Sequence, residues 1–302
     1  MILTSKDIKM KWRGGNQSLN VDDKRASSGG GGGINLALLI PIVKFLIKTK
    51  FGRIILLVGV VAAFLGFNPL NLLNFSAIGG NASASKFQNT QADQEAKDFV
   101  ATVLKQTEDT WGAIFSRHNA RYVEPKLLLF HGAINSGCGY ASSQVGPFYC
   151  PVDTKIYLDT DFFSDLAKNH NAAGDFAQGY VIAHEVGHHV QNLLGILSNA
   201  DKLKARTNES GANAIQVKVE LQADCFAGIW GHNQYKILED GDLEEALNAA
   251  TMIGDDTLQK KARGYVVPDS FTHGSGKDRK EWFYKGFKTG DLNACLTGLE
   301  SW

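Results

Sequence analysis

The ten residues Val181–Val190 constrain the fold of this chain more than any other stretch, because they contain the pattern H-E-x-x-H. His184 and His188 are four residues apart, so on an α-helix their imidazoles lie on one face, one above the other. The two rings can then bind one metal ion, and Glu185 can reach a water molecule held by that metal. The apolar neighbours predict a buried helix from about Asp175 to Leu194. Two nitrogen ligands and a general base on one helix are typical of zinc peptidases, although a buried helix can also carry these residues by coincidence.

A catalytic zinc site needs three protein ligands and one open position. The stretch Val217–Cys225 offers the third ligand, because Glu220 and Asp224 are four residues apart and share one face of a second, largely apolar helix. Glu220 can complete a His₂Glu site, and Asp224 can accept the free N–H of a ligating imidazole and orient it. Buried carboxylates without partners are costly, which favours this interpretation over an acidic pair with no function. Glu209 and His232 are rival ligands, and Asp224 itself could replace Glu220.

The charge balance and the cysteines narrow the class of protein. Lysine and arginine together number 31, as do aspartate and glutamate, so the net charge of zero gives no indication of nucleic-acid binding. The four cysteines form an even set without a C-x-x-C pair, which favours two disulfides over a second zinc site. Three pairings are possible. We expect Cys138–Cys150, which would close one loop, and Cys225–Cys295, which would hold the C-terminal tail to the second helix.

The N-terminal part of the chain differs in composition from the rest. Residues 1–33 are polar and end in a run of glycines, so we expect a disordered N-terminus. Residues 34–77 hold two apolar runs, and the second, from Ile54 to about Phe75, has the length of a membrane-spanning helix. Small and polar residues at 78–89 predict a linker, which leaves 90–302 as the metallopeptidase domain.

Basic residues precede the second apolar run, and none follows it until Lys86. The positive-inside rule then predicts a single span, with the N-terminus in the cytoplasm and the domain outside. Disulfides persist in such an oxidising compartment. The lipid bilayer is therefore an expected partner. Two alternatives stay open: both apolar runs could insert as a hairpin, or a signal peptide could be cleaved near Ala82–Ala84.

The remaining pattern predicts a mainly helical domain with a small sheet. We expect a long amphipathic helix at 91–116, strands at 126–130 and 155–159, and further helices at 161–168, 241–250 and 255–262. Ile156–Asp159 is a candidate edge strand that would pair with an extended substrate, the alternative being an ordinary core strand. His189 lies beside His188 but is rotated off the ligand face, so we expect it to pack or to form a hydrogen bond.

Four groups of motifs occur together in this chain: His184–Gln191, Glu220–Cys225, Ser136–Cys138 with Gly146–Pro151, and Met10–Arg13 with Asn20–Arg25. In combination they resemble the bacterial putative neutral zinc metallopeptidase family, and the resemblance runs from Met10 almost to Trp302. It implies zinc ligands at His184, His188 and Glu220 and a base at Glu185. The E-x-x-x-D pairing is also similar to that of gluzincins and of CAAX-processing membrane zinc peptidases. By that analogy His273, near Arg279, donates to the oxyanion; a surface histidine without a catalytic role is the alternative.

We therefore expect an α+β, zincin-like metallopeptidase domain, mainly helical with a small sheet, behind an N-terminal transmembrane anchor. The expected cofactor is Zn²⁺ and the expected substrate is a peptide or protein. In a bacterium the predicted topology places the domain on the periplasmic side of the inner membrane. Two alternatives stay open: an inactive membrane-anchored binding or scaffold protein that retains its zinc site, and a structural zinc domain with four protein ligands.

Overall fold

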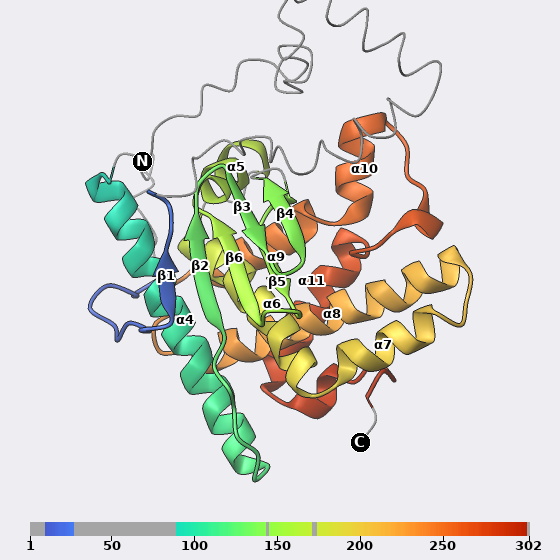
Figure 1. Cartoon of the computed structure of the whole chain (residues 1–302), viewed down its shortest axis with the longest axis horizontal. Coiled ribbons are helices and arrows are strands. Elements are labelled where there is room, and N and C mark those ends of the chain that lie inside the picture. Colours follow the sequence, from blue (N-terminus) through green and yellow to red (C-terminus); the bar gives the residue numbers. More distant parts are fainter. Residues whose placement is uncertain (1–9, 27–88, 143–144, 171–173, 301–302) are drawn as a thin grey trace, which may run out of the picture. The chain divides into compact units, whose positions relative to one another are not determined.

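A four-stranded sheet lies beside the predicted active-site helix (Figure 1). This computed structural model describes residues 10–26, 89–142, 145–170 and 174–300. The strand order is β1-β2-β6-β5, with β1, β2 and β6 parallel and β5 antiparallel to β6. A separate antiparallel hairpin, β3–β4, follows β2 and is joined to β5 by the disulfide Cys138–Cys150. The strand bounds are β1 Val21–Asp23, β2 Lys126–Phe130, β3 Ala133–Ser136, β4 Gly139–Ser142, β5 Phe148–Cys150 and β6 Lys155–Asp159.

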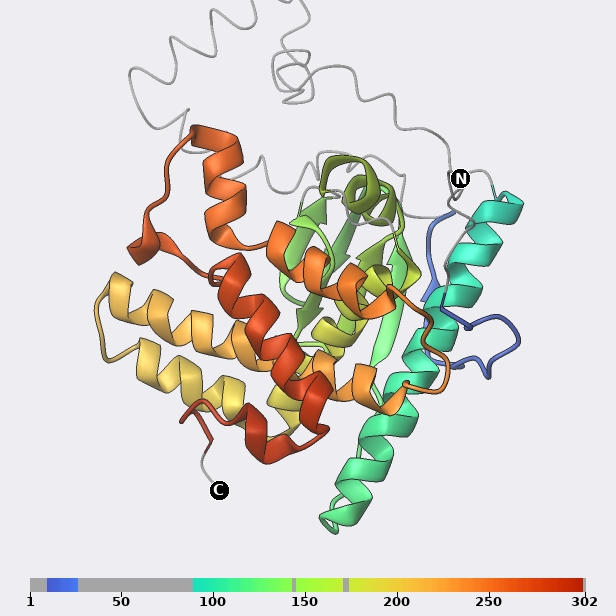
Figure 2. The same ribbon diagram turned by 180° about the vertical axis from the view of Figure 1, so that it is seen from behind.

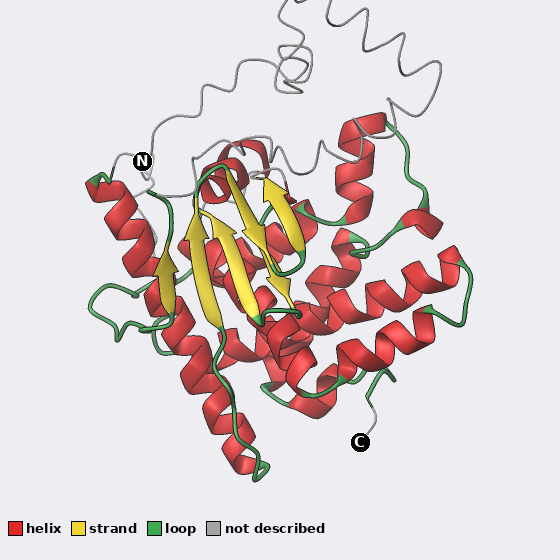
Figure 3. Ribbon diagram, in the orientation of Figure 1, coloured by secondary structure: helices red, strands yellow, loops and turns green. Residues whose placement is uncertain are grey.

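The helices make up most of the described residues (Figure 3). The central helix α6 contacts β5 and β6 on one side and α8 and α9 on the other. Figure 2, drawn from behind, shows α9 and α11 on the helical side of the sheet. The bounds are α4 Gln91–Arg117, α5 Asp161–His170, α6 Asp175–Leu193, α7 Ile196–Lys204, α8 Glu209–Asn233, α9 Asp242–Met252, α10 Asp255–Arg263 and α11 Gly276–Thr289, with the 3-10 turns η3 Pro268–Ser270 and η4 Leu292–Cys295.

The hydrophobic core occupies both faces of the sheet. Alternate residues of a strand point to opposite faces. Accordingly, Leu127 and Leu129 of β2 belong to the large core on the helical side, whereas Leu128 and Phe130 pack against Ile134 of the hairpin. The sheet is therefore buried on both faces, which explains why β2 reads as a continuous apolar run.

Glycines allow the helices that carry the site to approach one another closely. A Cβ at Gly187 of α6 would lie 3.0 Å from the carbonyl oxygen of Ala223 in α8. Between α8 and α11 the approach is tighter, because a Cβ at Gly286 would lie 1.9 Å from the carbonyl oxygen of Cys225. These two glycines allow α8 to pack closely between α6 and α11, so that polar side chains of all three helices can meet.

Residues 10–26 are part of the domain, although the sequence predicts that they belong to a disordered segment at 1–33. Residues 10–26 belong to the same unit as the rest of the described chain. Met10 and Trp12 are buried in the core, and the Trp12 indole donates to Asp175 Oδ2 at the start of α6 (2.9 Å). Arg25 is fully buried and donates to both carboxylate oxygens of Asp23 and to the Asp93 carbonyl oxygen of α4. A strand of three residues, paired with a partner about a hundred residues away, carries no periodic signal in the sequence.

The predicted fold class is corrected in one respect, the N-terminal transmembrane anchor. Over the described ranges of the chain, no helix is both long and apolar enough to cross a membrane. The segment 34–77, to which the anchor was assigned, lies outside the described residues. The parallel pairing of β1 with β2 also conflicts with the predicted single-pass topology, because two neighbouring strands of one sheet lie on the same side of any membrane. The predicted mainly helical α+β class with small sheets agrees with the structure.

Most of the predicted elements occur at or near their predicted bounds, and both predicted disulfides are present. The prediction of an edge strand is wrong for Ile156–Asp159. This segment lies in β6, between β2 and β5, so it is a core strand, and β5 is the edge of the sheet nearest the site. The three residues of β5 follow a Gly-Pro pair and show no alternation long enough to predict a strand.

Candidate metal centre

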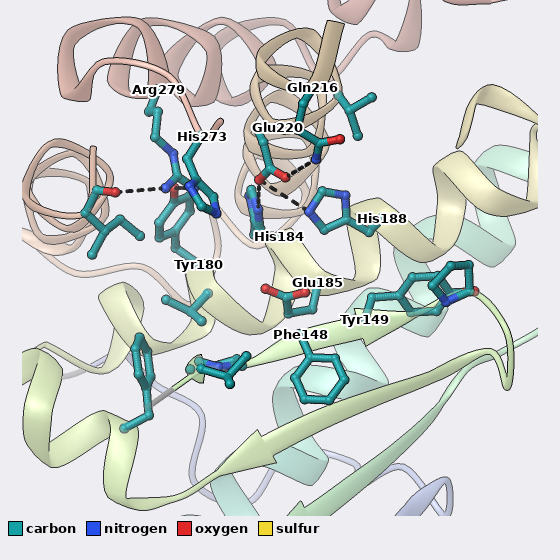
Figure 4. Close-up of a pocket in the computed structure, with 18 of the residues that line it drawn as sticks. Phe148, Tyr149, Tyr180, His184, Glu185, His188, Gln216, Glu220, His273 and Arg279 are labelled. Atoms are coloured by element: carbon teal, nitrogen blue, oxygen red, sulfur yellow. Dashed lines mark hydrogen bonds and ion pairs between the residues drawn. The ribbon is translucent and has the colours of Figure 1, made fainter. Parts of the chain in front are cut away.

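Three predicted ligands from two helices converge on one point (Figure 4). Glu220 Oε2 of α8 lies 3.2 Å from His184 Nε2 and 3.5 Å from His188 Nε2, both on α6. Ligand atoms of a tetrahedral zinc site are about 3.3 Å apart when the metal–ligand bonds are about 2.0–2.1 Å. The spacing of the three atoms therefore suits a zinc ion, and their number leaves one position open.

The orientation of His184 is fixed by a buried group of charged residues. His184 Nδ1 lies 2.8 Å from Asp224 Oδ1, one turn after Glu220 on α8. Arg279 of α11 donates to both oxygens of Asp224, from Nε at 2.9 Å and from Nη2 at 3.0 Å. Tyr180 Oη donates to Asp224 Oδ1 (2.6 Å). Because a carboxylate can only accept, His184 donates from Nδ1 and keeps the lone pair of Nε2 directed at the metal position.

The other two ligands are held by amide side chains. His188 Nδ1 lies 2.9 Å from Gln191 Oε1, one turn later on α6. Gln216 Nε2 donates to Glu220 Oε1 (2.8 Å), which leaves Oε2 to face the two histidines. Gln216 in turn accepts a hydrogen bond from Lys204 Nζ (2.6 Å). Each of the three ligand side chains thus has its second polar atom engaged outside the metal position.

The buried charges of the site favour a bound cation. Glu220 and Asp224 are both almost fully buried, and Arg279 balances only one of them. Burial by itself lowers the pKa of His184, but the carboxylates of Asp224 and Glu220 outweigh it and raise this pKa to about 10. Burial raises the pKa of Glu220, whereas the imidazoles of His188 and His184 lower it well below its ordinary value. A proton on His184 would balance the one uncompensated charge, and a divalent ion held by the two imidazoles and Glu220 would balance it without that proton. The residues present therefore fit a zinc ion.

A cleft of about 970 Å³ opens over the metal position. Glu185 lines it, and in Figure 4 its carboxylate lies between the three ligands and strand β5. Among the described residues this carboxylate has no hydrogen-bond partner. Phe148 and Tyr149 of β5 form the opposite wall. The cleft therefore places a free carboxylate and a sheet edge next to one metal position.

Comparison with known proteins agrees with this geometry. The family described as putative neutral zinc metallopeptidase matches residues 10–298. The chain belongs to this family. It is 45% identical to the uncharacterized protein YpfJ of Escherichia coli K12 over 290 residues, which cover 95% of this chain and 98% of YpfJ. It is 42% identical to the uncharacterized protein Rv2575 of Mycobacterium tuberculosis H37Rv over 216 residues, which cover 67% of this chain and 72% of that protein. No solved structure matched the chain.

In this member of the family, His273 faces the cleft from the loop that precedes α11. Its Nδ1 lies 3.3 Å from Asp255 Oδ1 and 3.1 Å from Thr272 Oγ1. Asp255 Oδ2 accepts the backbone N–H groups of Thr272, His273 and Gly274, which fixes the loop. The hydrogen bond to Asp255 raises the pKa of His273 and so favours its doubly protonated ring. Asp255 could not be found from the sequence, because its partners lie 17 to 19 residues further on, in a loop.

The other residues considered as ligands lie elsewhere. Glu209 is exposed at the start of α8, and His232 Nδ1 bonds the carbonyl oxygen of Phe287 at the far end of that helix. His189 packs as predicted, with Nε2 2.7 Å from the Val123 carbonyl oxygen. Arg279, predicted from the sequence only as a neighbour of His273, binds Asp224 and so supports the residue that orients His184. Gln191 could have been found from its spacing three residues after His188.

Proposed function

We propose that this protein is a zinc-dependent peptidase, with His184, His188 and Glu220 as metal ligands and Asp224 as the residue that orients His184. The observation that carries the proposal is the convergence of two Nε2 atoms and one carboxylate oxygen beside a free glutamate in one cleft. Bound zinc would polarise the scissile carbonyl and lower the pKa of a water molecule toward 7.

Glu185 is the proposed general base. It is 7% exposed, and its carboxylate is free to accept a hydrogen bond from an attacking water. Glu185 takes a proton from that water and later delivers it to the leaving amine. His273 donates from Nε2 to the oxyanion, because Asp255 holds its Nδ1–H and favours the doubly protonated ring.

The proposed substrate is an extended peptide that pairs with the edge of β5. Within the described residues, β5 has one strand neighbour, β6, so its other edge can form backbone hydrogen bonds. Since Phe148 and Tyr149 of this strand line the cleft, a peptide along it would pass Glu185 and the metal position. Backbone pairing recognises peptides of many sequences.

The Glu185→Gln variant tests this proposal. It keeps the shape and burial of the side chain but removes the base. We expect it to retain zinc and to lose hydrolysis of a peptide library by roughly 10²–10⁴-fold. Glu209→Gln, which changes an exposed glutamate on α8, is the matched control and should retain both properties. Parental hydrolysis by Glu185→Gln would rule out the assigned base.

A further inference from the structure

A chain of hydrogen bonds leads from His188 to the C-terminal tail. Gln191 Nε2 donates to Gln222 Oε1 of α8 (3.0 Å) and to the Val219 carbonyl oxygen (2.7 Å). Gln222 Nε2 donates to the Cys295 carbonyl oxygen (3.0 Å) and to the Glu300 carboxylate. Gln191 and Gln222, here called the amide relay, are 0% and 1% exposed.

The direction of these hydrogen bonds is fixed by groups that can only accept. The carbonyl oxygen of Val219 can only accept, so the amide nitrogen of Gln191 faces it and the amide oxygen of Gln191 faces His188. In the same way, the Cys295 carbonyl oxygen and the Glu300 carboxylate face the amide nitrogen of Gln222. His188 must therefore donate from Nδ1, which leaves its Nε2 lone pair for a metal.

The C-terminal tail, which forms the far end of the relay, is attached to α8 by a disulfide as well as by the hydrogen bonds from Gln222. The disulfide Cys225–Cys295 joins the turn η4 to α8, three residues after Gln222. Glu300 also accepts the backbone N–H groups of Thr297 and Gly298, so its carboxylate is held in place by the tail itself. The tail thus presents two acceptors, fixed in position, to a buried amide that would otherwise lack them. A buried polar group without a partner is unfavourable, so each link constrains the next.

We propose that Gln191 and Gln222 are positioning residues for His188, and that the tail residues Cys295 and Glu300 are the end of this relay. The proposal rests on the proposed function, since His188 is there a zinc ligand. Its consequence is that the zinc affinity of the site depends on the last residues of the described chain. Residues that orient metal ligands typically change metal affinity by about 10–100-fold when they are removed.

The experiment combines two measurements on the full chain. The first is the zinc dissociation constant, from competition with a chelator, for the parent, Gln191→Leu, Gln222→Leu, Glu300→Ala and Glu300→Gln. The second is the tautomer of His188 in the zinc-free protein, from ¹⁵N-labelled histidine by NMR at alkaline pH. We expect the Nδ1–H tautomer in the parent, a loss of zinc affinity of about 10–100-fold for the two leucine variants, and a smaller loss for Glu300→Ala. Glu300→Gln keeps an acceptor and should restore most of that affinity.

A matched control separates the relay from general loosening of the tail. Asn199 Nδ2 donates to the Leu299 carbonyl oxygen (2.7 Å), so Asn199→Ala frees the tail without touching the relay. It should bind zinc like the parent. An equal loss in Asn199→Ala and Glu300→Ala, or parental affinity in both leucine variants, would overturn the proposal. If a leucine variant fails to fold, the zinc affinity of Glu300→Ala compared with that of Asn199→Ala still tests the proposal. A parent that binds no zinc would refute the proposed function. The relay would then be tested by the tautomer of His188 alone: the Nδ1–H form in the parent, weakened in Glu300→Ala, would support it, and the same tautomer ratio in both proteins would refute it.

Discussion

The two sides of the cleft are built in different ways. On the helical side, α6, α8 and α11 bring together two histidines, two buried carboxylates and Arg279. On the sheet side, short strands from three distant parts of the chain contribute mostly apolar residues and one edge, β5. Buried charges are tolerated only when every partner is present, whereas apolar packing loses stability by degrees. Damage to the helical side should therefore affect both stability and metal binding, and damage to the apolar packing should lower stability and leave metal binding unchanged.

The largest effect is expected for Arg279→Met on the helical side. The substitution leaves the Asp224 carboxylate buried without its counter-charge, which costs about 3–5 kcal/mol of unfolding free energy. It should also weaken zinc binding, because Asp224 orients His184. Urea unfolding and chelator competition measure the two effects. Lys277→Met, an exposed lysine on the same helix, is the control and should stay within about 0.5 kcal/mol of the parent. Parental stability of Arg279→Met would contradict the role of this charge group.

Trp12→Ala tests the apolar packing away from the metal position and the inclusion of residues 10–26 in the domain. Trp12 is buried against Phe99 and donates to Asp175, so its loss should lower the unfolding free energy by about 3–5 kcal/mol. Zinc affinity of the folded fraction should remain parental. Leu19→Ala, in the same segment but 99% exposed, should change stability by less than about 0.5 kcal/mol. Equal stabilities of the two variants would show that residues 10–26 do not pack on the domain.

His273→Ala should reduce turnover without changing either stability or zinc content. Loss of one oxyanion donor costs about 10²-fold in kcat, or roughly 2.7 kcal/mol in the barrier. Asp255→Asn should reproduce part of this loss, because Asp255 orients the ring and favours its protonated form. Steady-state kinetics on a peptide substrate measure both. An unchanged kcat in His273→Ala would favour the alternative of a surface histidine without a catalytic role.

The smallest effect is expected for Glu245 of α9, whose carboxyl group lies next to the start of α6. Burial, and then the nearby charge of Asp242, raise the pKa of Glu245 from its ordinary 4.5 to about 7. The folded state therefore binds this proton more tightly than the unfolded state, and the associated stability is lost as the pH rises from 4.5 through about 7. Glu245→Gln should flatten the dependence of unfolding free energy on pH in this window. Urea unfolding of the zinc-free protein at several pH values measures it, and identical slopes in variant and parent would refute the shift.

The difference between local helical spacing and contacts between distant segments explains what the sequence could predict. The bounds of α6 and the pairing of Glu220 with Asp224 follow from helical spacing within a few residues, so they were found. Strand β1 and the edge role of β5 depend on pairing between distant segments and were missed. The contacts of Asp224 with Arg279 and of Gln222 with Glu300 join residues 55 and 78 positions apart. No local pattern encodes such contacts, although the cost of burying Asp224 alone already predicted that it must have a partner.

The most direct test of the account is the zinc content of the purified full-length protein and of its Glu220→Ala variant. We predict one zinc ion per chain in the parent and its loss in the variant, because removal of Glu220 leaves only two of the three ligand atoms that converge in the cleft. A zinc-free parent, or a variant that binds zinc as tightly as the parent, would contradict the His₂Glu centre.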